Sequence, residues 1–224
     1  MVLSSVALSA NADPFRQVAP ALLEGRLLRV DASAGTVTFP ATVHLAEGAL
    51  EYAIVTPTGA VHESLLVTEV DPVDLHAACL LLGWKPEHPQ PDMVGGLGGA
   101  LTAETLRAAP DLAGVAVRLR ITWNITGTQQ EAYLENWVRT VPEGRVAEPG
   151  AWTYTGSYLA GTQFASKSEG SVVCLVTNPA ALINNPRPHH DDDHAWEVNS
   201  AQVPAVGTPV TVSIIRVKVP PSTP

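Results

Sequence analysis

One alternating run constrains the fold of this chain more than any other feature. Between residues 115 and 125 every second residue is large and apolar, and the residues between them are small or polar; the apolar set is Val115, Val117, Leu119, Ile121, Trp123 and Ile125. Because side chains alternate between the two faces of a strand, this pattern predicts a long strand with one buried and one solvated face. Thr126–Thr128 then has the composition of a turn, so the chain from Gln129 onward is expected to return as the hairpin partner.

Further strands are indicated by short β-branched and aromatic runs, and a short helical turn is an alternative for Leu134–Val138. The turn signal Pro57–Gly59 predicts that 51–70 forms a hairpin. In the last apolar run the alternation changes phase at Ile214 and Ile215, which predicts a β-bulge there. The remaining expected strands are Thr36–His44, Glu51–Thr56, His62–Val70, Trp152–Tyr158, Ser171–Thr177 and Val210–Val219.

One helix is well marked. Asp71 is suited to cap it, Pro72 to its first position and Gly83 to its C-terminal end. Residues 77–82 are apolar on all sides, so this helix is expected to be buried, and a second short helix is expected over 102–109. The predicted fold class is therefore α+β: a single domain, mainly antiparallel β-sheet, with one buried helix packed on it and short additional helices.

Composition and charge exclude some classes of binding partner. The chain has 224 residues, of which 46% are hydrophobic and 16% charged, so it can fold rather than remain disordered. Its net charge is −9, and no Lys/Arg cluster is present to displace phosphate counterions, which argues against nucleic acid. No run approaches the roughly 20 apolar residues of a membrane span. Small molecules, metal ions and proteins remain as partners.

The first residues favour export. Val2–Ala10 is apolar and small, and Ala10–Ala12 fits a signal-peptidase site, so residues 1–12 are expected to be a signal-peptide remnant and 13–224 a single exported or periplasmic domain. The alternative is a frayed N-terminus. Cys79 and Cys174 would form one disulfide in an oxidising compartment, but both lie in apolar runs, which favours buried thiols.

Several segments together resemble the YdjY-like domain of bacterial proteins. The resemblance covers nearly the whole chain and is strongest in its first half, around His62–Ser64 and Leu75–Ala78. It implies an exported protein or lipoprotein and no particular activity. Some members are labelled ferredoxin-like, but two cysteines are too few for an iron–sulfur cluster, so none is expected here. The matching segments are 39–43, 50–68, 74–83, 155–157, 170–173, 178–179, 191–196 and 204–210.

A run rich in histidine and aspartate, 188–194, is the strongest candidate site. In an extended chain His190, Asp192 and His194 fall on one side, whereas in a helical turn His190 and His194 share a face with Asp191 between them; His189 lies next to both arrangements. Two imidazoles and a carboxylate suit zinc, copper or iron. The alternative is a solvated acidic loop. Calcium bound by Asn184, Asn185 and Asp191–Asp193 is a weaker alternative, because calcium-loop spacing is missing.

A second group, His62, Glu63 and Ser64, has the residue types of a nucleophile and base. On a strand His62 and Ser64 would share a face about 6–7 Å apart, too far for direct bonding, and no Gly-x-Ser-x-Gly elbow is present. A polar strand face is favoured, with His62 and Glu63 open as binding residues. His76, one turn into the helix, is expected to be a core histidine bonded to a backbone carbonyl. Gly95–Gly99 lacks the Lys-Ser/Thr of a phosphate loop and is read as a loop.

Two functional hypotheses follow. The first is an extracytoplasmic binding or accessory module of unknown ligand that holds a divalent metal through His190, Asp192 and His194. The alternative is a metal-assisted hydrolase with the same metal site and Glu63 or an aspartate as base. The first is preferred, because no complete set of catalytic residues can be assembled from the sequence.

Overall fold

The computed structural model describes residues 26–86 and 112–217. The expected N-terminal signal remnant, the helix over 102–109 and the Gly95–Gly99 loop lie outside the described residues. In the part of the chain that the structure describes, no helix has the length and apolar character needed to span a membrane.

The long alternating strand is confirmed. β5 (Val115–Ile125) pairs with β6 (Thr128–Tyr133) as an antiparallel hairpin, from Ile125 opposite Thr128 to Arg120 opposite Tyr133. Thr126 and Gly127 form the turn with φ of 47° and 84°, and positive φ at both positions is typical of the two-residue turns that match the twist of a hairpin. Of the two alternatives for Leu134–Val138, the structure has the short helical turn, as the 3₁₀-helix η2 (Leu134–Trp137).

The main sheet closes on itself. Eight strands form a ring: β2 (Thr36–Val43), β15 (Pro209–Arg216), β5, β9 (Trp152–Tyr154), β13 (Ile183–Asn184), β12 (Ser171–Cys174), β3 (Tyr52–Val55) and β4 (Ser64–Val67), which pairs again with β2. All neighbouring pairs are antiparallel except β3–β4 and β12–β13. The mainly antiparallel α+β fold is therefore confirmed, but the sheet is a barrel. Its core includes Val37, Phe39, Leu119, Ile121, Val212 and Ile214, all at most 1% exposed.

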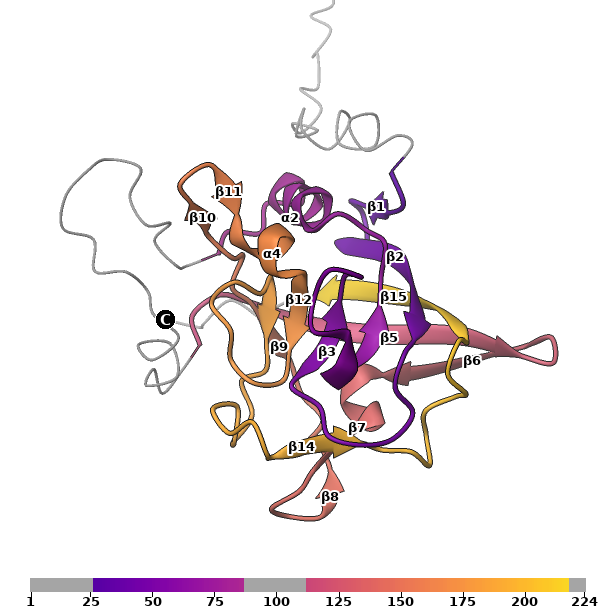
Figure 1. Cartoon of the computed structure of the whole chain (residues 1–224). Coiled ribbons are helices and arrows are strands. Elements are labelled where there is room, and N and C mark those ends of the chain that lie inside the picture. Colours follow the sequence, from indigo (N-terminus) through magenta and orange to yellow (C-terminus); the bar gives the residue numbers. More distant parts are fainter. Residues whose placement is uncertain (1–25, 87–111, 218–224) are drawn as a thin grey trace, which may run out of the picture.

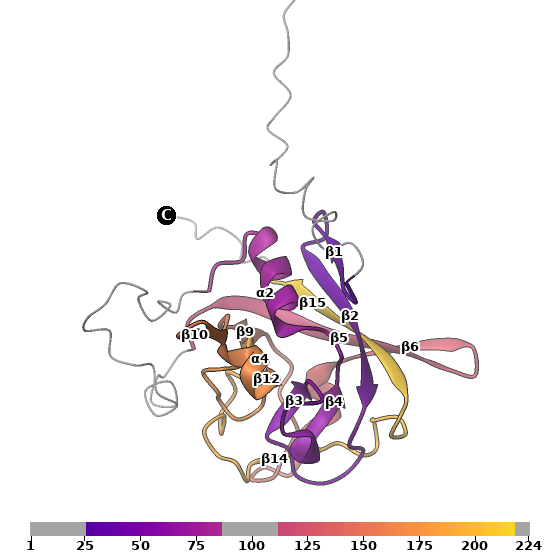
Figure 2. The same cartoon turned by 45° about the horizontal axis from the view of Figure 1, so that its top comes forward.

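Smaller elements cover the two ends of the barrel (Figure 1). At one end lie β1 (Arg29–Asp31), α2 (Pro72–Leu81) and α4 (Ala165–Glu169), as Figure 2 shows from another side. At the other end a separate three-stranded sheet runs in the order β14 (Trp196–Val198), β7 (Val138–Thr140) and β8 (Arg145–Val146). The hairpin of β10 (Leu159–Ala160) and β11 (Gln163–Phe164) precedes α4.

The α2 helix begins and ends as its sequence indicates. The Asp71 side chain accepts a hydrogen bond from the Val73 N–H, Pro72 is the first helical residue, and Gly83 has φ of 73°. The prediction that the helix is buried on all sides is wrong. It buries Leu75, Ala78 and Cys79 against the barrel but leaves Val73 and Leu80 40% and 46% exposed, because it covers the barrel end as a lid with one outer face.

The predicted hairpin over 51–70 is also wrong. After β3 the chain makes a turn, passes through the 3₁₀-helix η1 (Val61–Glu63) and returns to the start of β3, where the Glu51 N–H donates to the Glu63 carbonyl. β4 therefore begins at Ser64, and runs parallel to β3 with Tyr52 opposite Ser64. The segment after Gly59 is long enough to carry the chain back along β3, so the turn signal does not produce an antiparallel partner.

The predicted bulge in the last strand is absent. β15 pairs residue by residue with β2 and β5 through Ile214 and Ile215, with no shift in register. The apolar phase change has a different cause: Ser213 is 5% exposed, so both faces of the strand are covered at this point. Burial on both faces removes the need for strict alternation.

Tryptophan side chains form part of the core. Trp137, Trp152 and Trp196 are at most 1% exposed, and Trp123 packs edge-on against Trp137 with ring centroids 5.0 Å apart. Cys79 and Cys174 are both free and buried.

Candidate functional site

The histidine- and aspartate-rich segment forms a loop between β13 and β14, and a buried arginine anchors its start. Arg187 is 7% exposed. Its Nε donates to the Glu148 carbonyl at 2.6 Å, its Nη2 to the Gly150 carbonyl at 3.0 Å and its Nη1 to Asn185 Oδ1 at 3.1 Å. Because three acceptors hold the guanidinium, the loop leaves the barrel wall in a defined direction.

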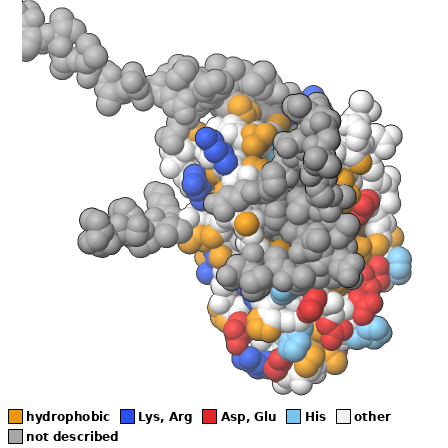
Figure 3. Space-filling view, turned by 90° about the vertical axis from the view of Figure 1, so that its left-hand side faces the viewer, with side chains coloured by type: hydrophobic (Ala, Val, Ile, Leu, Met, Phe, Trp, Pro, Cys, Tyr) orange, Lys and Arg blue, Asp and Glu red, His pale blue; other side chains and the backbone are white. Residues whose placement is uncertain are grey.

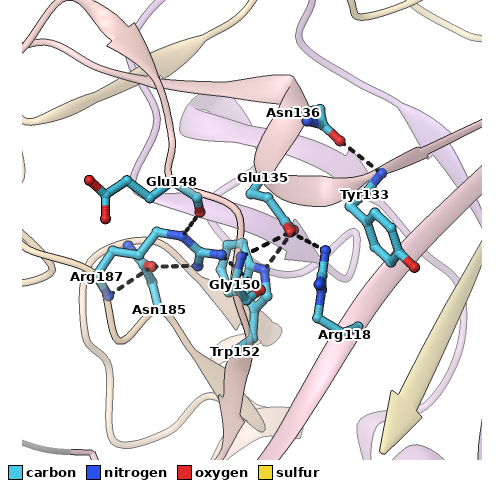
Figure 4. Close-up of polar contacts among 9 residues, drawn as sticks. All are labelled: Arg118, Tyr133, Glu135, Asn136, Glu148, Gly150, Trp152, Asn185 and Arg187. Atoms are coloured by element: carbon cyan, nitrogen blue, oxygen red, sulfur yellow. Dashed lines mark hydrogen bonds and ion pairs between the residues drawn. The ribbon is translucent and has the colours of Figure 1, made fainter. Parts of the chain in front are cut away.

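A second buried charge lies next to this anchor (Figure 4). Glu135, 1% exposed, accepts hydrogen bonds from Arg118 Nη2 at 2.7 Å, from the Trp152 indole N–H at 3.3 Å and from the Gly150 N–H at 3.3 Å. Gly150 thus binds Glu135 through its N–H and Arg187 through its carbonyl. The Arg187 guanidinium also lies over the Trp152 ring, 4.9 Å from the centroid. The two buried ions, Glu135 and Arg187, tie η2, β5 and β9 to the base of the loop.

His189 fixes the middle of the loop to the sheet below it. It adopts φ of 66°, a left-handed conformation that is uncommon for a non-glycine residue. Its carbonyl accepts a hydrogen bond from the Trp196 indole at 3.0 Å, and its Nε2 lies 2.7 Å from Glu143 Oε1. Hydrogen bonds to Thr140 and His189 lower the pKa of Glu143. A small pocket beside this contact is lined by Thr140, Glu143, Arg145, Val146, Glu148, Arg187, Pro188, His189 and Trp196.

His190 is held away from the tip of the loop. Its Nδ1 lies 2.7 Å from the Thr177 hydroxyl, and its carbonyl accepts a hydrogen bond from the Thr177 N–H at 2.6 Å. This double contact joins the loop to the segment after β12. His190 therefore lies outside the group of side chains that meets at the tip.

The tip brings together Asp192, Asp193 and His194, each through one ligand-type atom, and these atoms lie within 4.8 Å of one another. His194 Nδ1 is 2.5 Å from Asp193 Oδ1 and 4.0 Å from Asp192 Oδ1, which also accepts a hydrogen bond from the His194 N–H at 2.9 Å. All three side chains are exposed. Figure 3 shows histidine and acidic side chains gathered on the lower part of one face of the molecule. Two carboxylates and an imidazole suit zinc or another borderline divalent ion, with coordination positions left for water or a ligand.

Two of the three residues expected to bind metal together, Asp192 and His194, meet at the tip; His190 does not join them, and Asp193 takes its place. Asp191 is exposed and His189 is engaged with Glu143. A regular backbone, extended or helical, would place His190 beside His194, whereas the loop is a series of turns. Asn184 and Asn185, the amides considered for calcium, are buried and hydrogen-bonded to Asn178, Thr155, Leu175 and Arg187.

The other candidate group, His62, Glu63 and Ser64, does not form a catalytic pair. His62 lies in η1 with 78% of its side chain exposed, and its Nε2 is 3.7 Å from Glu63 Oε1. Ser64 is buried at the start of β4, and its hydroxyl donates to the Ala60 carbonyl at 2.5 Å. The two residues do not share a strand face as expected, because the strand begins only at Ser64.

His76 lies in α2 over the barrel end, and its bonding partner differs from the expected backbone carbonyl. Its Nδ1 lies 2.8 Å from the Tyr154 hydroxyl, and its ring packs on Phe164 at a centroid distance of 5.0 Å. Burial lowers the pKa of His76 from 6.5 to about 4, so the imidazole is neutral. His76 bonds to a side chain in place of a backbone carbonyl because the Tyr154 hydroxyl reaches from β9 toward the helix.

Comparison with protein-family models relates most of the chain to a known family. A family model described as the YdjY domain matches residues 28–215. No curated protein and no solved structure matches the chain.

Proposed function

The chain belongs to the YdjY domain family, and from that premise we propose that it is an extracytoplasmic, non-catalytic binding or accessory module that holds a divalent metal ion at Asp192, Asp193 and His194. One observation carries the proposal: three ligand-type atoms of these residues lie within 4.8 Å of one another at an exposed turn. An ion bound through His194 Nδ1 would replace the hydrogen bond between this nitrogen and Asp193.

The base of the loop supports a binding role. Arg187, Trp196 and Thr177 hold the residues before and after the tip through buried or half-buried contacts. A ligand set on an anchored loop loses less conformational entropy on binding than one on a free chain. The exposed position leaves open coordination sites, so a metal held here would be accessible to a partner or small ligand.

Two observations argue against covalent catalysis by a serine or cysteine nucleophile. Ser64, the serine considered as a nucleophile, donates its hydroxyl to the Ala60 carbonyl. Both thiols are buried, and burial raises their pKa, so neither is an accessible thiolate.

Zinc titration by isothermal calorimetry tests the proposal, with the protein first stripped of metal by a chelator. We expect His194→Ala and Asp193→Asn each to weaken zinc affinity by more than about tenfold, since the first removes one of three ligands and the second removes the negative charge of another. His62→Ala is the matched control, because His62 is also an exposed histidine beside an acidic side chain. Its affinity should equal that of the wild type.

Equal zinc affinity of the wild type and His194→Ala would refute the site. A screen of esterase, phosphatase and amidase substrates addresses the non-catalytic role separately. Turnover that disappears with chelator and with His194→Ala would replace the binding module by a metal-assisted hydrolase.

A further inference from the structure

Strand β6 is an edge strand that projects from the barrel. The β5–β6 hairpin extends away from the body in both views (Figures 1 and 2). Within the described residues β6 pairs with β5 alone. From Asn124 to Gln129 every residue of the hairpin is exposed, so a partner can approach this edge without displacing other described parts of the fold.

The register of the hairpin identifies the backbone groups that face outward. In a two-residue hairpin the residues flanking the turn, Ile125 and Thr128, exchange both backbone hydrogen bonds, and every second pair after them does the same. Gln130 and Ala132 therefore bond to β5. The N–H and C=O groups of Gln129 and Glu131 point to the open edge, and no described backbone group bonds to them.

This edge lacks the features that usually prevent strand addition. Natural edge strands are protected by proline, by lysine or by bulges. Thr128–Tyr133 has the sequence TQQEAY, without proline or a basic residue, and pairs with β5 without a register shift. Only Glu131 brings a charge, and Arg120 lies 4.0 Å from it.

We propose that a second copy of this chain binds this edge, so that the two β6 strands pair antiparallel about a two-fold axis at Gln130. In this register Gln129 of one copy pairs with Glu131 of the other, and the reverse pair forms by symmetry. Both residues present outward N–H and C=O groups, so each of the two pairs makes two backbone hydrogen bonds. The two hairpins then form one continuous four-stranded sheet.

The side chains are complementary in the same register. Glu131 lies opposite an uncharged Gln129, so no like charges face each other, and Gln130 faces its own copy. On the face of Gln130, Ala132 lies opposite the Thr128 of the second copy, beside Ile125, which is 49% exposed in the single chain. A self-complementary patch of this kind is what a two-fold dimer requires.

The interface is small, so the dimer is expected to be weak. Sedimentation equilibrium should therefore extend to about 1 mM protein, where weak association becomes visible. Salt at about 0.15 M screens the repulsion between two chains of net charge −9. The average mass of the wild type should rise with concentration from monomer toward dimer.

Two variants of Glu131 separate the backbone from the side chain. Glu131→Pro removes an outward N–H without removing a bond to β5 and should stay monomeric. Glu131→Ala keeps the N–H and should associate like the wild type. Circular dichroism checks that Glu131→Pro is folded.

A cysteine pair tests the register even where the proline variant does not fold. Gln130→Cys should form a disulfide-linked dimer on mild oxidation, because the two copies of residue 130 face each other in a pair with Cα atoms about 4.5 Å apart. Gln129→Cys is the matched control, and its two copies should be too far apart to link. The native Cys79 and Cys174 are buried and do not interfere.

A monomeric wild type over the whole concentration range would overturn the proposal. The proposal would also be overturned if Glu131→Pro were folded and associated as strongly as the wild type. In that case the chains would associate through another surface. Equal cross-linking of the two cysteine variants would overturn the register at Gln130.

Discussion

Replacing Glu135 by alanine should destabilise the protein strongly, because this buried carboxylate is the shared acceptor of three donors. Arg118 Nη2 lies 2.7 Å from it, the Trp152 indole N–H 3.3 Å and the Gly150 N–H 3.3 Å. The alanine variant leaves the Trp152 N–H without its acceptor in a site where Trp152 is 1% exposed. It also leaves the Arg118 guanidinium, with 29% of the side chain exposed, without its counter-ion.

The magnitude follows from these contacts. A buried donor without an acceptor costs about 1–3 kcal/mol, and a hydrogen bond to a charged group contributes about 1.5–3 kcal/mol. The long Gly150 contact adds less. The expected loss in free energy of unfolding is about 3–5 kcal/mol, in the range found when one partner of a buried ion pair is removed. For a domain of this size the melting temperature should fall by roughly 6–20 °C. Glu135→Gln should lose less, since one acceptor oxygen remains.

Urea unfolding followed by tryptophan fluorescence measures this loss. Glu131→Ala is the matched control: Glu131 also pairs with a β5 arginine, at 4.0 Å, but 67% of its side chain is exposed. Its loss should stay below about 1 kcal/mol, as for other surface ion pairs. A loss for Glu135→Ala no larger than that of Glu131→Ala would refute the reasoning that Glu135 supports the base of the loop.

Two further predictions concern buried titratable groups. Burial lowers the pKa of His76 to about 4 from its ordinary 6.5, so the unfolded chain binds a proton that the folded chain does not as pH falls from 6.5 to 4. The contribution of His76 to stability is fully present above pH 6.5, and the wild type should lose up to about 3 kcal/mol of it as the pH falls from 6.5 to 4. His76→Gln should lack this loss when urea unfolding is measured at pH 6.5 and at pH 4. An equal dependence of stability on pH in the two proteins would contradict the prediction. Burial raises the pKa of Cys79 and Cys174, so a thiol reagent should label neither in native buffer and both in denaturant. Rapid labelling of either thiol in the folded protein would contradict the buried positions.

Local patterns in the chain predict much of the secondary structure. The informative patterns all involve residues close in sequence. They are the alternation over 115–125, the polar turn after it, and the signals of Asp71, Pro72 and Gly83 around α2. Such interactions decide dihedral angles and caps directly, so the hairpin and the helix were predictable. The prediction of a hairpin over 51–70 was wrong because a turn signal does not specify the direction in which the chain returns.

The candidate site is less predictable, because its geometry depends on contacts between distant parts of the chain. Glu143 and His189 are 46 positions apart, and His190 is held by Thr177, 13 positions before it. The spacing of the residues predicted that His190 would lie with Asp192 and His194, but this holds only if the backbone is regular throughout the run. The contacts of His189 and His190 bend the loop, and Asp193 joins the tip instead.

The amino-acid sequence alone thus determined that this chain has a mainly antiparallel sheet, a capped helix and a loop rich in histidine and aspartate, because periodicity, caps and composition act over a few residues. The tertiary structure decided that the sheet closes through β2 and β4, that β3 and β4 run parallel, and that Glu135 and Arg187 are buried beneath the loop. These features depend on strand pairing and burial between segments far apart in the chain, and packing of the whole core selects them from the many arrangements that the same local patterns allow.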